Sequence, residues 1–107
     1  MTTFDNRKDA AEKKFAHDAD LQFKAGARRN KLLGLWAASQ MGISGEAAEA
    51  YAKTVVMSDF EEAGDEDVFR KVRGDFDGAK IEVTDHVIRR TMDELMAKAI
   101  TDIQTGG

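Results

Sequence analysis

Anion recognition is the first chemistry that the sequence offers, because three cations fall within residues 28–31, whose sequence is RRNK. Guanidinium and ammonium groups bind carboxylates and phosphates. A helix turns by about 100° per residue, which places Arg28 on the face of Leu32, whereas Arg29 and Lys31 point elsewhere. We therefore expect Arg28 at the rim of the core, with its head group free for an acid on another helix or for the phosphate of an adenine nucleotide. No glycine-rich loop accompanies the cluster, and a solvated helix face is the alternative interpretation.

Metal binding and catalysis find little support in the residue types. The two histidines, His17 and His86, belong to different predicted helices, and the chain has no cysteine, so a tetrahedral nitrogen or sulfur site is not expected. Acids such as Asp65 and Asp85 stand at predicted helix starts, where the helix dipole explains them without acid–base catalysis. Tyr51 and the serines have no histidine close in the sequence to activate them. We expect neither an enzyme nor a bound cofactor.

The size and charge of the chain narrow its class. Its 107 residues, 42% of them hydrophobic, suffice for one small domain with a modest core. The lack of cysteine and of a long apolar run favours a soluble, cytoplasmic protein that does not insert into a membrane. Residues 1–31 hold eight basic and five acidic residues, a balance of +3, and the remainder holds eight basic and fifteen acidic residues, a balance of −7. This distribution argues against nucleic-acid binding and leaves the basic front free to approach an acidic partner.

The elements that must position these residues are predicted to be helices. The chain has no proline and is rich in alanine, lysine and glutamate, so propensity favours long helices. The predicted helices with their end signals are residues 5–41 closed by Gly42, residues 45–60 capped by Ser44 and closed by Gly64, residues 65–78 closed by Gly78, and a last helix capped by Thr84. Ile81 and Val83 alternate as in a strand, but a single strand has nothing to pair with. We expect an all-α fold, a small four-helix bundle.

Each predicted helix of the bundle carries an apolar face at helical spacing. The predicted core residues are Leu32, Leu33, Leu35 and Trp36; Ala48, Tyr51, Ala52, Val55 and Val56; Val68, Phe69, Val72 and Phe76; and Ile88, Met92, Leu95, Ala99 and Ile103. Burying each large side chain contributes roughly 1.5 to 3 kcal/mol, so these faces are enough to hold the bundle together.

The front of the first helix has a different character. Phe4, Ala11 and Phe15 share one stripe, at i, i+7 and i+11, and few other apolar side chains accompany them. Charged side chains cover the rest of the surface at Arg7, Lys8, Glu12, Lys13 and Lys14. This is the pattern of a helix that docks in a groove of another protein, and an unstructured tail is the alternative. We expect residues 1–18 to form a mobile arm on a bundle of residues 19–107.

Several sequence blocks resemble those of a known family. The run FDNRKDAAEKKFAHDADLQFKAGARRNKLLGLWAA, followed by AYAKTVVMSDF and GDEDVFRKV, is similar to the zeta subunit that inhibits the F-type ATP synthase of alphaproteobacteria. The resemblance extends from Phe4 to about Val72. It implies a small helical bundle with a mobile inhibitory arm that enters an interface between alpha and beta subunits, touches the gamma shaft and blocks rotation in the direction of hydrolysis.

The resemblance also implies which residues contact the enzyme. The arm positions that it carries over are Phe4, Asp5, Arg7, Ala11, Lys14 and Phe15, and we expect Lys8 and Glu12 of the same arm to contact the partner as well. Arg28 and Arg29 lie at the junction of arm and bundle, where contact with an enzyme subunit is also expected. The implied location is the cytoplasm, peripheral to the inner membrane through the ATP synthase. A module that binds adenine nucleotide weakly, or a plain helical adaptor, is the alternative function.

Residues 1–18 are predicted to be mobile in the free protein, because their few apolar side chains cannot offset an ordering cost of roughly 1 to 2 kcal/mol per residue. Amide hydrogen exchange should therefore be fast across residues 7–15 and slow in the apolar run that begins at Leu32. Slow exchange across residues 7–15 of the monomer would contradict the interpretation as an arm.

Overall fold

The computed structural model describes the backbone of residues 3–59 and 65–105, and the side chains of residues 20–59 and 65–105. Most of these residues belong to four helices: α1 (Thr3–Gln40), α2 (Gly45–Ser58), α3 (Glu66–Gly78) and α4 (Asp85–Gln104). No strand occurs among them, so the prediction of an all-α fold of four helices is confirmed. The predicted closing residue Gly64 lies outside the described residues.

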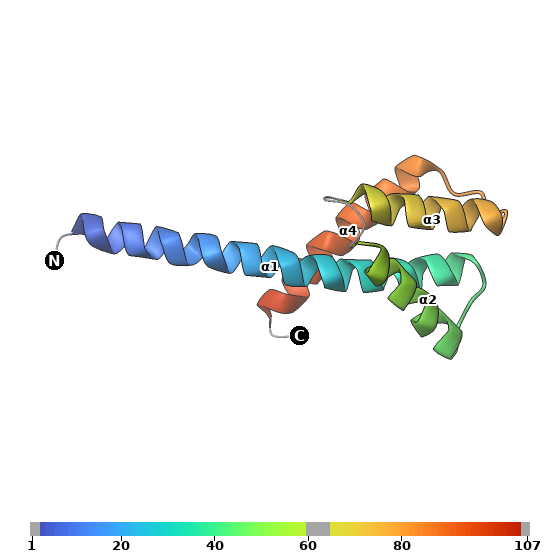
Figure 1. Ribbon diagram of the computed structural model, residues 1–107, viewed down its shortest axis with the longest axis horizontal. Coiled ribbons are helices and arrows are strands. Elements are labelled where there is room, and N and C mark those ends of the chain that lie inside the picture. Colours follow the sequence, from blue (N-terminus) through green and yellow to red (C-terminus); the bar gives the residue numbers. More distant parts are fainter. Residues whose placement is uncertain (1–2, 60–64, 106–107) are drawn as a thin grey trace.

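α1 is the longest element and the axis of the fold. Its 38 residues span about 57 Å at about 1.5 Å per residue. The other three helices pack around its carboxyl-terminal half, and the amino-terminal half extends beyond them as a single helix (Figure 1). The molecule accordingly measures 63 Å along its longest axis and 25 and 21 Å across it. The predicted long first helix is confirmed.

Two helix ends follow the predicted signals. Gly42 has a φ of 76°, and the amide of Ile43 donates to the carbonyl of Ala38 at 2.8 Å, which is the Schellman arrangement that closes α1. At the start of α4 the hydroxyl of Thr84 accepts a hydrogen bond from the amide of Val87 at 3.2 Å. Local hydrogen bonds therefore fix the chain direction at both places.

Two other ends differ from the expectation. Ser44 stands at the cap position of α2 with an extended backbone, yet its side chain makes no capping hydrogen bond in the described part of the chain. α3 ends at Gly78 as predicted, but the left-handed residue behind it is Lys80, with a φ of 60°. The amide of Ile81 then donates to the carbonyl of Phe76 at 2.8 Å, so the chain turns back on α3 instead of continuing as a strand.

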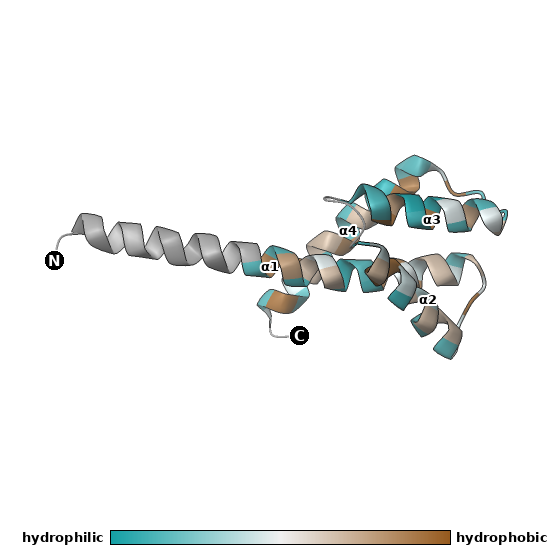
Figure 2. Cartoon of the chain, viewed as in Figure 1, coloured by the Kyte–Doolittle hydropathy of each residue, from teal (hydrophilic) through white to brown (hydrophobic). Residues whose placement is uncertain are grey.

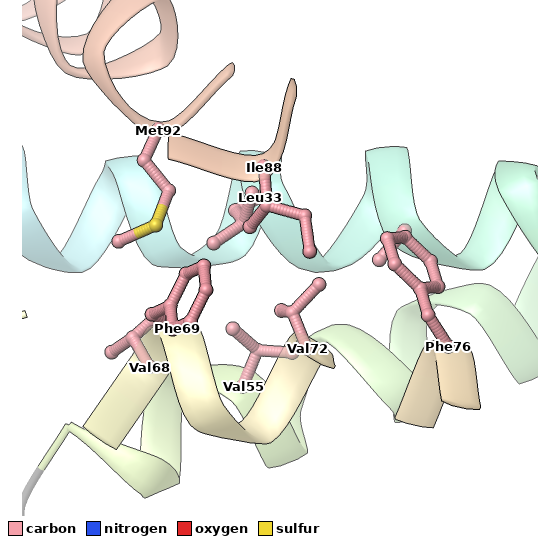
Figure 3. Close-up of a cluster of buried hydrophobic side chains, with 9 residues drawn as sticks. Leu33, Val55, Val68, Phe69, Val72, Phe76, Ile88 and Met92 are labelled. Atoms are coloured by element: carbon pink, nitrogen blue, oxygen red, sulfur yellow. The ribbon is translucent and has the colours of Figure 1, made fainter. Parts of the chain in front are cut away.

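The core lies where α2, α3 and α4 meet the carboxyl-terminal half of α1 (Figure 3). Its buried side chains are Leu33, Ala37, Val55, Val68, Phe69, Val72, Phe76, Ile88 and Met92. Trp36 is partly buried against this cluster and meets the ring of Phe76 edge-on, with the ring centroids 5.6 Å apart. Hydrophilic and hydrophobic residues are mixed along each helix, as expected where one face is buried (Figure 2). Most of the predicted apolar positions therefore form the core, whereas Leu32, Leu35, Val56 and Ile103 are only partly buried and lie outside this cluster.

α1 and α2 approach each other closely at Gly34 and Ala52. A Cβ atom added to Gly34 would lie 2.5 Å from Cα and 2.9 Å from Cβ of Ala52. Because no side chain fits into that space, only glycine allows the approach. Gly34 thereby sets the distance between the two helices.

Gly34→Ala should destabilise the fold by about 1 to 3 kcal/mol, because the added methyl group forces α1 and α2 apart. The matched control is Gly26→Ala in the same helix, where nothing lies within 4 Å of the added Cβ. There the higher helix propensity of alanine should stabilise the fold by roughly 0.5 to 1 kcal/mol. Chemical denaturation of both variants measures the difference. A neutral or stabilising Gly34→Ala would show that the helices adjust their distance without cost.

Candidate functional site

Arg28 lies at the rim of the bundle, as predicted, and contacts an acid of another helix. Its side chain is 41% exposed, and its Nε donates to Oδ2 of Asp102 in α4 at 3.2 Å. Lys98 donates a hydrogen bond to the same carboxylate. The hydrogen bond from Lys98, followed by that from Arg28, lowers the pKa of Asp102. The contact joins the end of α4 to the part of α1 at which the amino-terminal half leaves the bundle.

Arg29 departs from the prediction, because it is only 4% exposed and does not point away from the core. Its Nη2 donates to Oδ1 of Asp65 at 2.9 Å, and its Nε donates to Oδ1 of Asn30 at 2.7 Å. The prediction is wrong because three helices surround α1, so its buried surface is wider than one stripe. Arg29 stands four residues from Ala25 and four from Leu33, both fully buried, and this spacing is the sequence signal for its position.

These placements change the interpretation of the cationic run. Arg29 offers almost no surface to a partner, and the head group of Arg28 is shared with Asp102. A nucleotide phosphate would have to displace a carboxylate at either arginine, so the structure does not favour a nucleotide site here. Lys31 is the most accessible of the three cations, with a 59% exposed side chain that lies 3.9 Å from Glu49.

Acids gather at the junction of α2 and α3, beside Arg29. Burial is the main cause that raises the pKa of Asp59, and repulsion from Asp67 and Asp65 adds to it, while the nearby Asn30 and Arg29 oppose the shift. Asn30 is 1% exposed, and its Nδ2 has no hydrogen-bond partner in the described parts of the chain. The folded protein therefore holds Asp59 in surroundings that disfavour its charge.

Tyr51 links α2 to α3. Its hydroxyl donates to Oδ2 of Asp75 at 2.7 Å, and Lys71 pairs with the same carboxylate at 2.9 Å while lying 5.4 Å from the centre of the tyrosine ring. Burial, followed by the hydrogen bond to Asp75, raises the pKa of Tyr51 well above its usual range. The phenol is therefore a fixed hydrogen-bond donor that holds the two helices together.

The described segments contain neither a group of metal ligands nor a helix that could span a membrane. Those segments contain no group of three or more histidine, cysteine, aspartate or glutamate residues arranged to hold a metal ion. None of their helices is both long enough and apolar enough to cross a membrane.

The predicted arm residues belong to the first part of α1. These positions are Phe4, Asp5, Arg7, Lys8, Ala11, Glu12, Lys14 and Phe15. The backbone is helical from Thr3 onward, so the spacing of the apolar stripe is that of one helical face. Figure 1 shows this part of α1 beyond the other three helices. The structure describes side chains only from residue 20, so the contacts of these residues and the boundary at residue 18 stay predictions.

Two exposed apolar side chains are absent from the sequence predictions. Phe23 of α1 is 74% exposed and Met57 of α2 is 65% exposed. Met57 borders a hollow that Lys31 and Lys53 also line. Periodicity alone does not show this, because Met57 directly follows Val56 at the edge of the predicted core face of α2.

Four helices, one of which extends far past the core, define the class of small all-α bundle proteins. The sequence model of the ATPase inhibitor subunit zeta family matches residues 1–102, and the chain belongs to that family. A protein whose structure was solved by solution NMR has 50% sequence identity to this chain, and the two folds superpose with a TM-score of 0.72. The match covers 81% of this chain and 99% of that protein. A search of the curated proteins finds no match. Because the family consists of inhibitor subunits, it supports a role as an ATPase inhibitor and not as a catalyst.

Asp59→Asn should stabilise the fold at neutral pH, because it removes a carboxylate whose charge the folded state disfavours. Folding raises the pKa of Asp59, so the wild-type protein loses stability as the pH rises from the unfolded pKa, about 4, through the folded pKa. The advantage of the variant should be complete at pH 7 and vanish below about pH 4. Thermal unfolding of both proteins across this range measures it. An advantage that persists at pH 3 would exclude the charge as its source.

Proposed function

We propose that the chain inhibits ATP hydrolysis by an F-type ATP synthase, and that it does so by inserting the amino-terminal part of α1 between an alpha and a beta subunit. The observation that carries the proposal is the extension of α1 past the helices that pack on it (Figure 1). A helix in this position has an apolar stripe and no partner helix of the bundle beside it. Membership of the ATPase inhibitor subunit zeta family supports an ATPase as the enzyme on which this helix acts.

The arm acts as a wedge in this mechanism. The stripe of Phe4, Ala11 and Phe15 gains apolar partners in the groove, which offsets the entropy lost when the helix becomes ordered there. The proposed polar contacts to the alpha, beta and gamma subunits are Asp5, Arg7, Lys8, Glu12 and Lys14. A helix held between two catalytic subunits opposes their closure, and contact with the gamma shaft opposes its rotation. Inhibition therefore needs no catalytic residue and no cofactor in this chain.

The bundle gives the arm a firm base. Arg28 joins the root of the arm to Asp102 of α4, and Arg29 joins the same turn of α1 to Asp65 before α3. Because two helices are tied to α1 at this point, the direction in which the arm leaves the bundle is fixed. We place the complex on the cytoplasmic side of the inner membrane, where this protein would be peripheral through the enzyme.

Deletion of residues 1–18 should abolish inhibition of ATP hydrolysis by the cognate enzyme, because the wedge is lost. The midpoint of thermal unfolding should stay almost unchanged, since the other three helices pack around the remaining half of α1. A hydrolysis assay with increasing amounts of each protein, together with thermal unfolding, measures both effects. Full inhibition by the shortened chain would refute the arm mechanism.

Phe15→Asp is a point variant that tests the same wedge in the full-length chain. It places an unpaired charge on the docking face and should raise the half-inhibitory concentration by about tenfold or more. Asp5→Asn and Glu12→Gln change polar positions outside the stripe and should each have a smaller effect. Equal losses from all three variants would contradict docking through the apolar stripe.

A further inference from the structure

The outer side of α2 carries a hollow that the wedge mechanism does not use. It has a volume of about 360 Å³ and lies between α1 and α2, lined by Lys31, Glu49, Ala52, Lys53, Val56 and Met57. We call these six residues the α2 groove. Ala52 is fully buried at its base, and Met57 stands at its edge with 65% of its surface exposed.

The groove exists because small residues bring the two helices together. Gly34 and Ala52 have no bulky side chain at the crossing, and none of the side chains that the structure describes fills the outer side of that contact. Met57 is one of only two large apolar side chains in the described segments that are mainly exposed. A hollow with an apolar residue at its edge can accept an apolar side chain from a helix of another protein.

The rim of the groove is positive although the body of the chain is negative. Lys53 is exposed and forms no ion pair with any residue that the structure describes. Lys31 lies 3.9 Å from Glu49, and both side chains are more than half exposed, so this contact is weak and readily exchanged. A second hollow continues past Lys53 and Met57 to Lys71 on α3. An apolar floor with lysines on both sides suits an amphipathic segment whose polar face is acidic.

We propose that the α2 groove is a second docking site for the enzyme and binds an acidic amphipathic helix of one of its subunits. An apolar side chain of that helix enters the hollow beside Val56 and Met57, and carboxylates on its flanks pair with Lys31 and Lys53. A helix fits because the trough between two packed helices accepts a third one lengthwise. The arm of this chain does not suit the groove, since residues 1–18 hold four basic and four acidic residues and so offer the lysines no acidic excess.

The proposal rests on the proposed function and assigns the bundle a separate task. Docking of the bundle holds the arm close to its interface, so insertion of the arm becomes an intramolecular step with a high effective concentration. Loss of the groove contact should then weaken binding without changing what the inserted arm does. Affinity and maximal inhibition are therefore expected to respond differently to variants of the groove.

The test uses full-length Lys53→Glu and Met57→Ser variants with the purified catalytic part of the cognate ATP synthase. Direct binding, measured by biolayer interferometry, should weaken at least tenfold for Lys53→Glu and severalfold for Met57→Ser, while inhibition at saturation stays complete. Both side chains are exposed, so neither change is expected to affect folding, and thermal unfolding checks this. The matched control is Arg90→Glu on α4, which makes the same change in net charge at a 57% exposed residue that pairs with Glu94 of its own helix.

The outcomes separate this inference from its alternatives. Unchanged binding of Lys53→Glu overturns it, and so does an equal loss for Arg90→Glu, which would indicate a general effect of charge. Concentration-dependent self-association of the wild-type chain that Lys53→Glu abolishes would show that the occupant is a second copy. If the wild-type chain binds the enzyme without inhibiting it, the proposed wedge fails, while a binding defect confined to Lys53→Glu and Met57→Ser still supports the groove.

Discussion

The distance between α1 and α2 at Gly34 is the constraint on which the remaining packing depends. Because Gly34 has no Cβ, Ala52 lies against the backbone of α1, and Val55, almost one turn further on, reaches the core. A larger residue at position 34 would lift α2, and α3 with it, since the hydrogen bond from Tyr51 to Asp75 ties these two helices together. The same approach leaves the outer side of the crossing open. The close-packed interior and the proposed α2 groove therefore have one cause.

The two neighbouring arginines determine orientation more than stability. The ion pair of Arg29 with Asp65 contributes little net free energy, because the Asp65 side chain is 58% exposed and water screens the attraction. Its geometry is demanding, however, and Arg29 satisfies it through two nitrogens that reach the two oxygens of Asp65, at 2.9 and 3.4 Å. Arg28, about 100° away around the same helix, makes the corresponding contact with Asp102 of α4. We infer that the pair fixes how the bundle is rotated about α1 at the base of the arm.

Helical periodicity was enough to predict the four helices and their apolar faces, because each face depends on one helix alone. It failed at Arg29, since burial there depends on how many helices surround α1, which is a property of the whole fold. From the sequence alone, Gly34 is only a residue of low helix propensity. Its role in packing depends on Ala52 of α2, which lies against it in the fold. In the candidate site, spacing predicted the arm stripe and the resemblance supplied its role. Met57 could not be predicted, because an apolar residue beside a core position suits the surface as well as the interior. Lys53 could not be predicted either, because its place beside Lys31 depends on how α2 packs on α1.

α1 belongs to both the bundle and the arm, so the bundle fixes the rotational setting of the arm. Residues 15 and 33 are separated by roughly five turns of a regular helix, so both positions face the same side, where Leu33 is buried in the core. Lys31, which lines the α2 groove, is about 160° away around the helix. The arm stripe and the groove therefore face nearly opposite directions. A single flat surface cannot cover both, whereas subunits that enclose an inserted helix can, so the two proposed contacts favour insertion over binding to an outer face of the enzyme.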